Sequence, residues 1–241
     1  MDHSNKGSVM GTQETLFLHE EIMLLALQDE KGTVAWGTYY QYALGGAILA
    51  ELLLNNLISI EVSKKKKMVN LVGSTPVVEP VIDECLKKIS SAKRRASVQT
   101  WVSKFAELKR LKHRIATQLC KRGILQVAED KVFLFFTRKV YPEINPEPEK
   151  ALIERLRKAI FTNTTDIDPR TVILLSLANS AGLLKLVFDR GELKSRKARI
   201  EQIVNGEMVG EGAKEAIEAM ETALVISTVV TSSVVTTASS S

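Results

Sequence analysis

The order of apolar and polar residues along this chain predicts a protein built mostly from helices. Through most of the sequence, apolar side chains recur every three or four positions, the spacing of a helix with one buried face. Acidic residues, prolines and glycines stand where such helices would begin and end. Helices are predicted over residues 16–27, 38–56, 81–89, 97–108, 108–121, 148–161, 169–182, 193–204 and 213–228.

Two short β-hairpins are predicted between the helices. The first joins strands over 57–62 and 68–72 through four consecutive lysines, which no core can hold and which therefore suit a solvated turn. The second runs from Gln126 to Phe136, with its turn at Ala128–Asp130. The turn residues of the first hairpin are Lys64, Lys65, Lys66 and Lys67. The whole pattern predicts a mostly α fold with small β-hairpins in a single compact helical domain.

The ends of the chain differ from its middle. We expect one domain over 15–229, a disordered amino-terminal tail over 1–14 and a flexible Val/Ser/Thr-rich tail over 230–241. The amino terminus is polar and has no signal-peptide core. The longest apolar run, Ala43–Leu54, contains Glu51 and is shorter than the ~20 residues that a membrane-spanning helix needs. These features predict a cytoplasmic protein.

The charge balance indicates a mild preference for anionic partners. Thirty-three Lys and Arg residues against twenty-eight Asp and Glu residues give a net charge of +5. This excess is too small and too dispersed for a dedicated nucleic-acid binder, and the predicted helix over 38–54 has no Lys or Arg with which to read bases. We therefore expect no nucleic-acid partner, although units of a helix followed by a hairpin are similar to winged helices.

No familiar catalytic or metal-binding pattern stands in the sequence. The dinucleotide, Walker, zinc-protease and nucleophile-elbow motifs are absent. His3, His19 and His113 lack a second ligand at helical spacing, and Cys85 and Cys120 are predicted to be reduced thiols in the core. We expect a protein that is not an enzyme and that uses no cofactor and no metal.

Positive charge on the predicted helix 108–121 is the most suggestive chemical feature. Lys109 and Lys112 would lie three positions apart on one face, while Ile115 and Leu119 would face the core. Two interpretations are open at this point. The lysines form either an ordinary solvated face or a surface that binds an anion.

Five segments follow one another along the chain: LFLHEEIMLLALQDEKGTVAW, LGGAILAELLLNNLISIE, STPVVEPVIDECLKKI, IATQLCKRGIL and DPRTVILLSLANSAGLL. In order and spacing they resemble the Golgi phosphoprotein family. The resemblance runs from about residue 15 to residue 223 and implies a helical, non-catalytic peripheral membrane protein. Members bind phosphatidylinositol 4-phosphate and help to retain Golgi enzymes, so the expected place is the cytosolic face of the Golgi in a eukaryotic host.

The resemblance also implies a head-group site. In the family, a tryptophan and several arginines hold the phosphoinositide, and here Trp36, Lys109 and Lys112 fall on matching positions. Lysine keeps the charge but loses the bidentate grip of arginine. A further family arginine falls on Gly45, beside Gly46, and this glycine pair would instead let another backbone approach closely.

The family's counterpart of the Gln126–Phe136 hairpin is linked to membrane insertion and to contacts between subunits. Phe133 is therefore expected either at the membrane or in the core, and the hairpin is a predicted contact for a homo-oligomer. The lysine run 64–67 is a further predicted membrane contact.

Charge alone would hold such a protein weakly on a membrane. Each lysine near an anionic surface contributes roughly 1 kcal/mol, so four would give ~4 kcal/mol and a dissociation constant near the millimolar range. The main alternative is an adaptor that binds acidic cytosolic tails of membrane proteins and has only incidental affinity for lipid.

Overall fold

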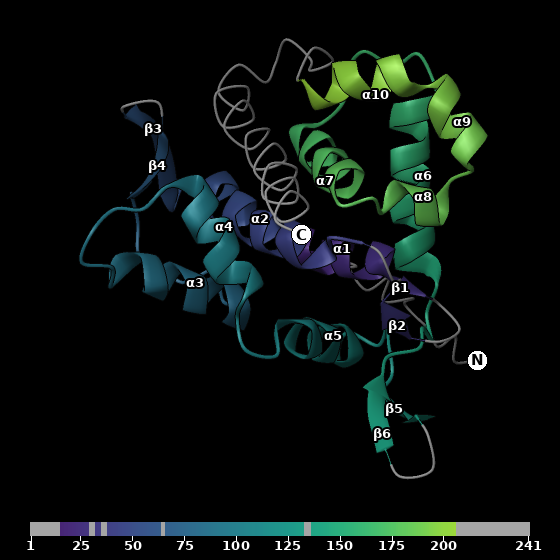
Figure 1. Ribbon diagram of the computed structural model, residues 1–241, viewed down its shortest axis with the longest axis horizontal. Coiled ribbons are helices and arrows are strands. Elements are labelled where there is room, and N and C mark those ends of the chain that lie inside the picture. Colours follow the sequence, from purple (N-terminus) through teal and green to yellow (C-terminus); the bar gives the residue numbers. More distant parts are fainter. Residues whose placement is uncertain (1–14, 29–31, 35–37, 64–65, 133–135, 206–241) are drawn as a thin grey trace, which may run out of the picture.

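Two buried helices form the centre of the structure. The computed structural model describes residues 15–28, 32–34, 38–63, 66–132 and 136–205. Helix α1 (Leu18–Ala26) is buried along its whole length, and α2 (Tyr40–Leu54) is buried from Ala43 to Leu53. Because both helices carry apolar residues on nearly every side, other helices must surround them. Figure 1 shows α4 and α5 on one side of this pair, and α6 and α7 on the other.

Three amphipathic helices cover one side of the centre. They are α3 (Pro80–Ser90), α4 (Val98–Ala106) and α5 (Leu111–Lys121). Side chains cap the first two, since Glu79 accepts a hydrogen bond from the backbone N–H of Ile82 at 2.5 Å and Ser97 accepts one from Thr100 at 3.2 Å. The three predicted helices of this region are confirmed. α3 extends one residue beyond its prediction at each end, whereas α4 and α5 are shorter than predicted.

Five helices make up the carboxyl-terminal part of the described chain. Asp168 caps α7, because its carboxylate accepts a hydrogen bond from the backbone N–H of Thr171 at 3.0 Å. The single helix predicted over 193–204 is wrong in outline, since two helices meet at Arg196 there, and the short α8 was not predicted. The predicted helix over 213–228 lies outside the described residues. The helices are α6 (Glu147–Phe161), α7 (Pro169–Ser180), α8 (Leu184–Val187), α9 (Arg190–Ser195) and α10 (Lys197–Val204).

Three two-stranded antiparallel hairpins complete the described fold. The smallest pairs β1 (Leu27–Gln28) with β2 (Thr33–Val34). The first predicted hairpin is confirmed as β3 (Ile58–Ser63) and β4 (Lys66–Leu71). Its turn is shorter than predicted, because the ladder continues through Lys66 and Lys67 in β4. Lys64 and Lys65 lie outside the described residues.

The second predicted hairpin exists, but its strands are displaced along the sequence. They are β5 (Ala128–Val132) and β6 (Phe136–Val140), so the predicted turn residues 128–130 belong to a strand. Opposite charges across the ladder favour this register, because Arg138 donates two hydrogen bonds to Asp130 at 2.7 and 2.9 Å. Figure 1 shows this hairpin projecting from the body.

Gly45 sets the distance between α2 and α4. A Cβ atom at this position would lie 2.4 Å from the backbone oxygen of Val102, which is closer than real contacts allow. The predicted close approach of another backbone is therefore confirmed, and α4 is the element that approaches. The mostly α fold with small hairpins is confirmed as well. Within the described residues, no helix is both long enough and apolar enough to cross a bilayer.

Candidate functional site

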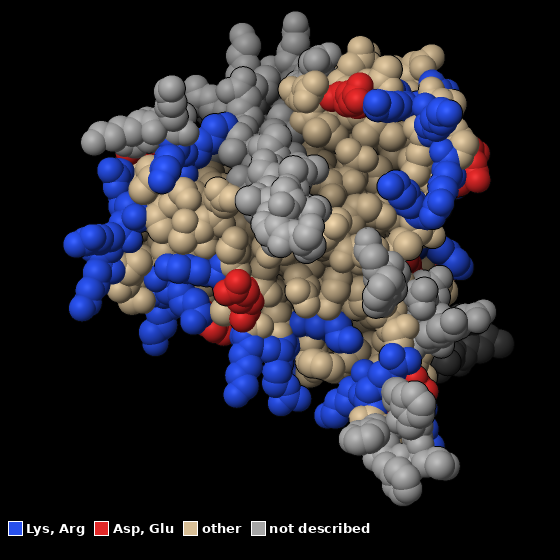
Figure 2. Space-filling view, in the orientation of Figure 1, with Lys and Arg blue, Asp and Glu red and all other residues tan. Residues whose placement is uncertain are grey.

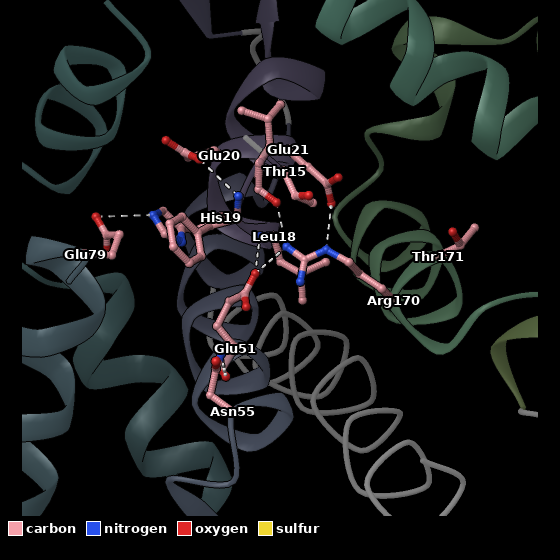
Figure 3. A network of polar contacts seen from close by, with 12 residues as sticks. Thr15, Leu18, His19, Glu20, Glu21, Glu51, Asn55, Glu79, Arg170 and Thr171 are labelled. Carbon is pink, nitrogen blue, oxygen red and sulfur yellow. Dashed lines mark hydrogen bonds and ion pairs between the residues drawn. The ribbon is translucent and has the colours of Figure 1, made fainter. Parts of the chain in front are cut away.

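A group of buried ionisable side chains surrounds α1. His19, Glu20, Glu21 and Glu51 are all buried there, as is Glu79 at the start of α3. Figure 3 shows these side chains between α1, α2 and the neighbouring helices. Buried carboxylates of this kind occur both in active sites and in structural ion pairs. Their partners distinguish the two cases.

Arginines from the surrounding helices engage the three carboxylates of α1 and α2. Glu20 pairs with Arg122, and Glu21 pairs with Arg155 at 2.7 Å. Glu51 pairs with Arg170 and also accepts the backbone N–H of Leu18 at 2.6 Å. Buried charges are tolerated when they are paired in this way. The group therefore ties α1 to the helices around it.

The same region offers neither a reactive thiol nor a metal site. Cys85 is buried and Cys120 is half-buried, and burial raises the pKa of both thiols above their ordinary value. Within the described part of the chain, no group of three or more His, Cys, Asp or Glu residues is placed to hold a metal ion.

A second candidate lies at the amino-terminal end of α5. Arg110 precedes the helix in the left-handed conformation, with φ of +58°, and supplies no side-chain cap. The first turn contains no acidic residue. Unpaired backbone N–H groups and the helix dipole make such an end attractive to anions. The prediction that Lys109 lies on the helix is wrong, because α5 begins at Leu111 and Lys109 stands in the preceding turn.

Two adjoining hollows flank this end of α5. The larger, of about 510 Å³, lies between α3 and α5, and Lys109 is among its lining residues. The smaller, of about 240 Å³, lies between the start of α2, the end of α4 and α5, and Lys112 is among its lining residues. Arg110 and His113 line both hollows. Among the residues that the structure describes, no Asp or Glu lines either hollow.

The positive charge at this end is uncompensated within the described residues. Lys109, Arg110 and Lys112 form no ion pair with a described carboxylate, whereas Arg114 pairs with Glu84 at 2.6 Å. Figure 2 shows Lys and Arg gathered along this lower edge of the molecule, over α5 and the base of the projecting hairpin.

The pKa of Lys112 reflects this concentration of positive charge. The residue is half-buried, and its burial lowers the pKa of its ammonium group. The neighbouring charge of Arg138, on β6, lowers this pKa further. An anion in the hollow would relieve both effects, because it would supply the missing counter-charge.

Comparison with known proteins agrees with this picture of the chain. The model of the family described as Golgi phosphoprotein 3 (GPP34) matches residues 18–220. The chain belongs to this family. It is also similar to vacuolar protein sorting-associated protein 74 of Schizosaccharomyces pombe. The two are 24% identical over 230 residues, covering 82% of this chain and 68% of that relative.

The family resemblance placed a head-group site on three residues, of which the structure describes two. Lys109 and Lys112 stand at the same end of α5 but line different hollows. Trp36 lies outside the described residues, although the chain resumes at Thr38 and Tyr40 lines the same hollow as Lys112. Gly45 is packed against α4, so this chain has no room there for the arginine of the family pattern.

The predicted membrane contacts do not adjoin this end of α5. Lys66 and Lys67 belong to β4, which Figure 1 shows at the upper left, away from α5 at the lower centre. Phe133, like Lys64 and Lys65, lies outside the described residues.

Sequence reasoning missed Arg110, His113, Arg138 and Tyr141. The first two belong to the same short basic stretch as the predicted lysines, so their proximity could have been noticed. The other two come from β6 and the residue after it, and nothing in their local sequence points toward α5. Tyr141 is held at Gly32, immediately before β2, because its backbone N–H donates to the backbone oxygen of Gly32 at 2.9 Å.

The strained cap of α5 allows a test that separates stability from binding. Replacing Arg110 with glycine should stabilise the fold by about 0.5–1 kcal/mol, since glycine adopts positive φ without the steric cost of a Cβ atom. The same change should weaken binding to anionic vesicles. Arg110→Ala is the matched control, because it removes the same charge and keeps the Cβ atom. Thermal unfolding and vesicle flotation would be measured on all three proteins, and equal unfolding temperatures for Gly and Ala would contradict the strain argument.

Proposed function

We propose that this protein is a non-catalytic peripheral membrane protein that binds phosphoinositide head groups at the amino-terminal end of α5. The observation that carries the proposal is the half-buried Lys112 beside Arg110, which forms no ion pair with a described carboxylate and lines a hollow whose described lining has no Asp or Glu. Phosphates carry the charge that this hollow lacks, and helix amino termini bind them well. By the family resemblance, the expected lipid is phosphatidylinositol 4-phosphate.

The energetics require more than a diffuse attraction. The charges of Lys109, Arg110 and Lys112, at about 1 kcal/mol each, would give a dissociation constant only in the millimolar range on an anionic surface. Stable membrane binding would need a shaped phosphate site at the helix end and an inserted aromatic side chain, which contributes about 1.5–3 kcal/mol.

The decisive experiment compares lipids that carry equal charge. Vesicles containing phosphatidylinositol 4-phosphate, its positional isomers or phosphatidylserine would be matched in total charge and floated with the protein at two salt concentrations. A shaped site predicts preference for one isomer that persists at the higher salt. Binding that follows charge alone and disappears with salt would contradict the proposal.

Trp36 provides a second test, which rests on the family pattern alone. Trp36→Ala should weaken vesicle binding more than neutralising any one of the four lysines 64–67, since one lysine contributes only about 1 kcal/mol. Co-sedimentation with phosphatidylinositol 4-phosphate vesicles measures the difference. An unchanged Trp36→Ala protein would remove this residue from the proposed site.

The cellular role proposed with this binding is that of an adaptor in Golgi trafficking, on the cytosolic face of the membrane. Family membership supports it, as does the similarity to a fission-yeast protein whose name associates it with vacuolar protein sorting. The projecting β5–β6 hairpin is the proposed contact with a second copy of the chain, and cytosolic tails of membrane proteins are the proposed cargo.

One feature favours the alternative of a protein-binding adaptor. A hollow of about 420 Å³ between α7, α8, α9 and α10 has apolar lining at Leu184, Leu193 and Ile200. Its charged lining includes Lys185 and Lys194 together with one carboxylate, Glu201. An acidic tail with an apolar side chain would suit it. Pull-down of defined acidic tail peptides without membranes, set against vesicle flotation, discriminates between the two functions.

A further inference from the structure

His113 occupies the wall between the two hollows of the α5 site. It lies in the first turn of α5, is half-buried, and lines both hollows. One ring nitrogen, Nδ1, is 2.9 Å from the hydroxyl oxygen of Tyr141. The two rings also contact each other, with centroids 5.7 Å apart. The imidazole is thus held in place by a neutral partner, and among the described residues no hydrogen bond engages its other nitrogen, Nε2.

Positive groups face this ring from three directions. Arg110 and Lys112 stand before it in the chain, and Lys139 approaches from β6. Tyr40 of α2 lines the smaller hollow, while α3 contributes only Pro80 and Val81 to the larger one. The remaining ionisable groups that line the larger hollow are Lys109, Arg114 and Lys121.

These surroundings favour the neutral form of the His113 imidazole. Burial lowers the pKa of His113 below its ordinary value, and the charges of Lys112, Arg110 and Lys139 lower this pKa further. An anion bound among these cations would reverse their effect. The imidazole would then gain a proton from solvent and could donate hydrogen bonds from both ring nitrogens.

We propose that His113 makes the α5 site selective for phosphate monoesters by taking up a proton when the dianionic group binds and by donating a hydrogen bond to it. A monoester carries roughly 1.5–2 negative charges at neutral pH, whereas a phosphodiester carries one, so the monoester drives protonation more strongly. This inference rests on the proposed function and adds the residue that distinguishes the two classes of phosphate.

The expected sign follows from linkage between proton and ligand. Because the complex holds one proton more than the free protein, affinity rises as pH falls through the range between the free and the bound pKa of His113. One proton can change affinity by at most about tenfold per pH unit. Below about pH 6 the monoester itself becomes protonated and loses charge, so affinity should pass through a maximum.

The test compares wild-type protein with His113→Gln, which keeps a hydrogen-bonding side chain but cannot titrate. Both would be floated on neutral phosphatidylcholine vesicles that carry either phosphatidylinositol 4-phosphate, a monoester, or phosphatidylserine, a diester. We expect wild-type affinity for the monoester to rise about three- to tenfold between about pH 7.5 and about pH 6.5. The affinity of His113→Gln for the monoester should change with pH only through protonation of the lipid phosphate itself. Vesicles that carry the diester should bind the two proteins with similar affinity.

A direct measurement protects the test against a variant that folds poorly. The ring protons of His113 in the wild-type protein would be titrated by NMR without ligand, with inorganic phosphate, with inorganic sulfate and with the monoester vesicles. Sulfate keeps its two charges across this range, so it isolates the titration of the protein. Phosphate and sulfate test the shared anion chemistry, and the vesicles test the membrane source.

The outcomes separate the two proposals. A pKa of His113 that rises with these anions, together with a steeper pH dependence in the wild type than in His113→Gln, supports the inference. Equal pH dependence in the two proteins, or an unmoved pKa in the presence of bound vesicles, overturns it and leaves the proposed function standing. A wild-type protein that binds neither vesicle overturns the proposed function, and the inference with it.

Discussion

Replacing Lys109 and Lys112 together with glutamate is expected to abolish binding to phosphatidylinositol 4-phosphate vesicles at physiological salt. The double change removes two of the cations at the end of α5 and places two carboxylates in hollows that now contain none. Repulsion between these carboxylates and the lipid phosphate, added to the lost attraction, amounts to about 4 kcal/mol on the scale of about 1 kcal/mol per surface charge. That corresponds to a loss of roughly a thousandfold in affinity.

The control places the same change of charge elsewhere. Lys150→Glu with Lys158→Glu alters two exposed residues of α6, which contributes no residue to either hollow. This variant should lose affinity only slightly, because exposed charges beyond a Debye length are screened. Equal losses in the two double variants would mean that net charge, and not the end of α5, recruits the protein. Circular dichroism would verify that both variants are folded.

Restoring the arginine of the family pattern with Gly45→Arg is expected to unfold the protein rather than to strengthen lipid binding. Even a methyl group at this position would overlap the backbone oxygen of Val102. Overpacking a core by a few methylene groups costs about 1–3 kcal/mol, and a guanidinium buried there without a partner would add several more. The total approaches the whole stability of an ordinary domain.

Urea denaturation of wild type, Gly45→Ala and Gly45→Arg would measure this cost in two steps. Gln41→Arg adds the same side chain on an exposed position of the same helix, and it should leave the unfolding midpoint nearly unchanged. A stable Gly45→Arg protein would show that α4 can withdraw from α2 at little cost. The close contact would then be incidental to the fold.

The helices were predictable because each depends on local pattern. Leu18–Ala26 and Tyr40–Leu54 have apolar residues and good helix formers in unbroken runs, which indicates a helix whatever surrounds it. Their ends were less predictable. The start of α5 depends on the left-handed conformation of Arg110, which no feature of the local sequence predicts. This conformation leaves Lys109 outside the helix.

The hairpin after α5 was misplaced for a different reason. Its apolar residues indicated one register, but the observed ladder places Asp130 opposite Arg138 and Glu129 opposite Lys139. These pairs stabilise the hairpin across the strands, and a search for apolar alternation does not detect them.

The residues of the candidate site were predicted only by the family resemblance. The resemblance pointed to Lys109 and Lys112, and the structure places both at one end of α5. Arg138 and Tyr141 reach that end because the projecting hairpin returns toward the body after β6. Such contacts between distant parts of the chain cannot be read from periodicity.

The ion pairs around α1 constrain the order in which this protein can fold during synthesis. Glu21 and Glu51 leave the ribosome early, but their partners Arg155 and Arg170 follow 134 and 119 residues later. Until those arginines emerge, the central helices must keep unpaired carboxylates away from an apolar interior. The nascent chain therefore has no stable half-folded product at its amino-terminal end. We expect it to acquire protease resistance late and in one step, once α7 has been made.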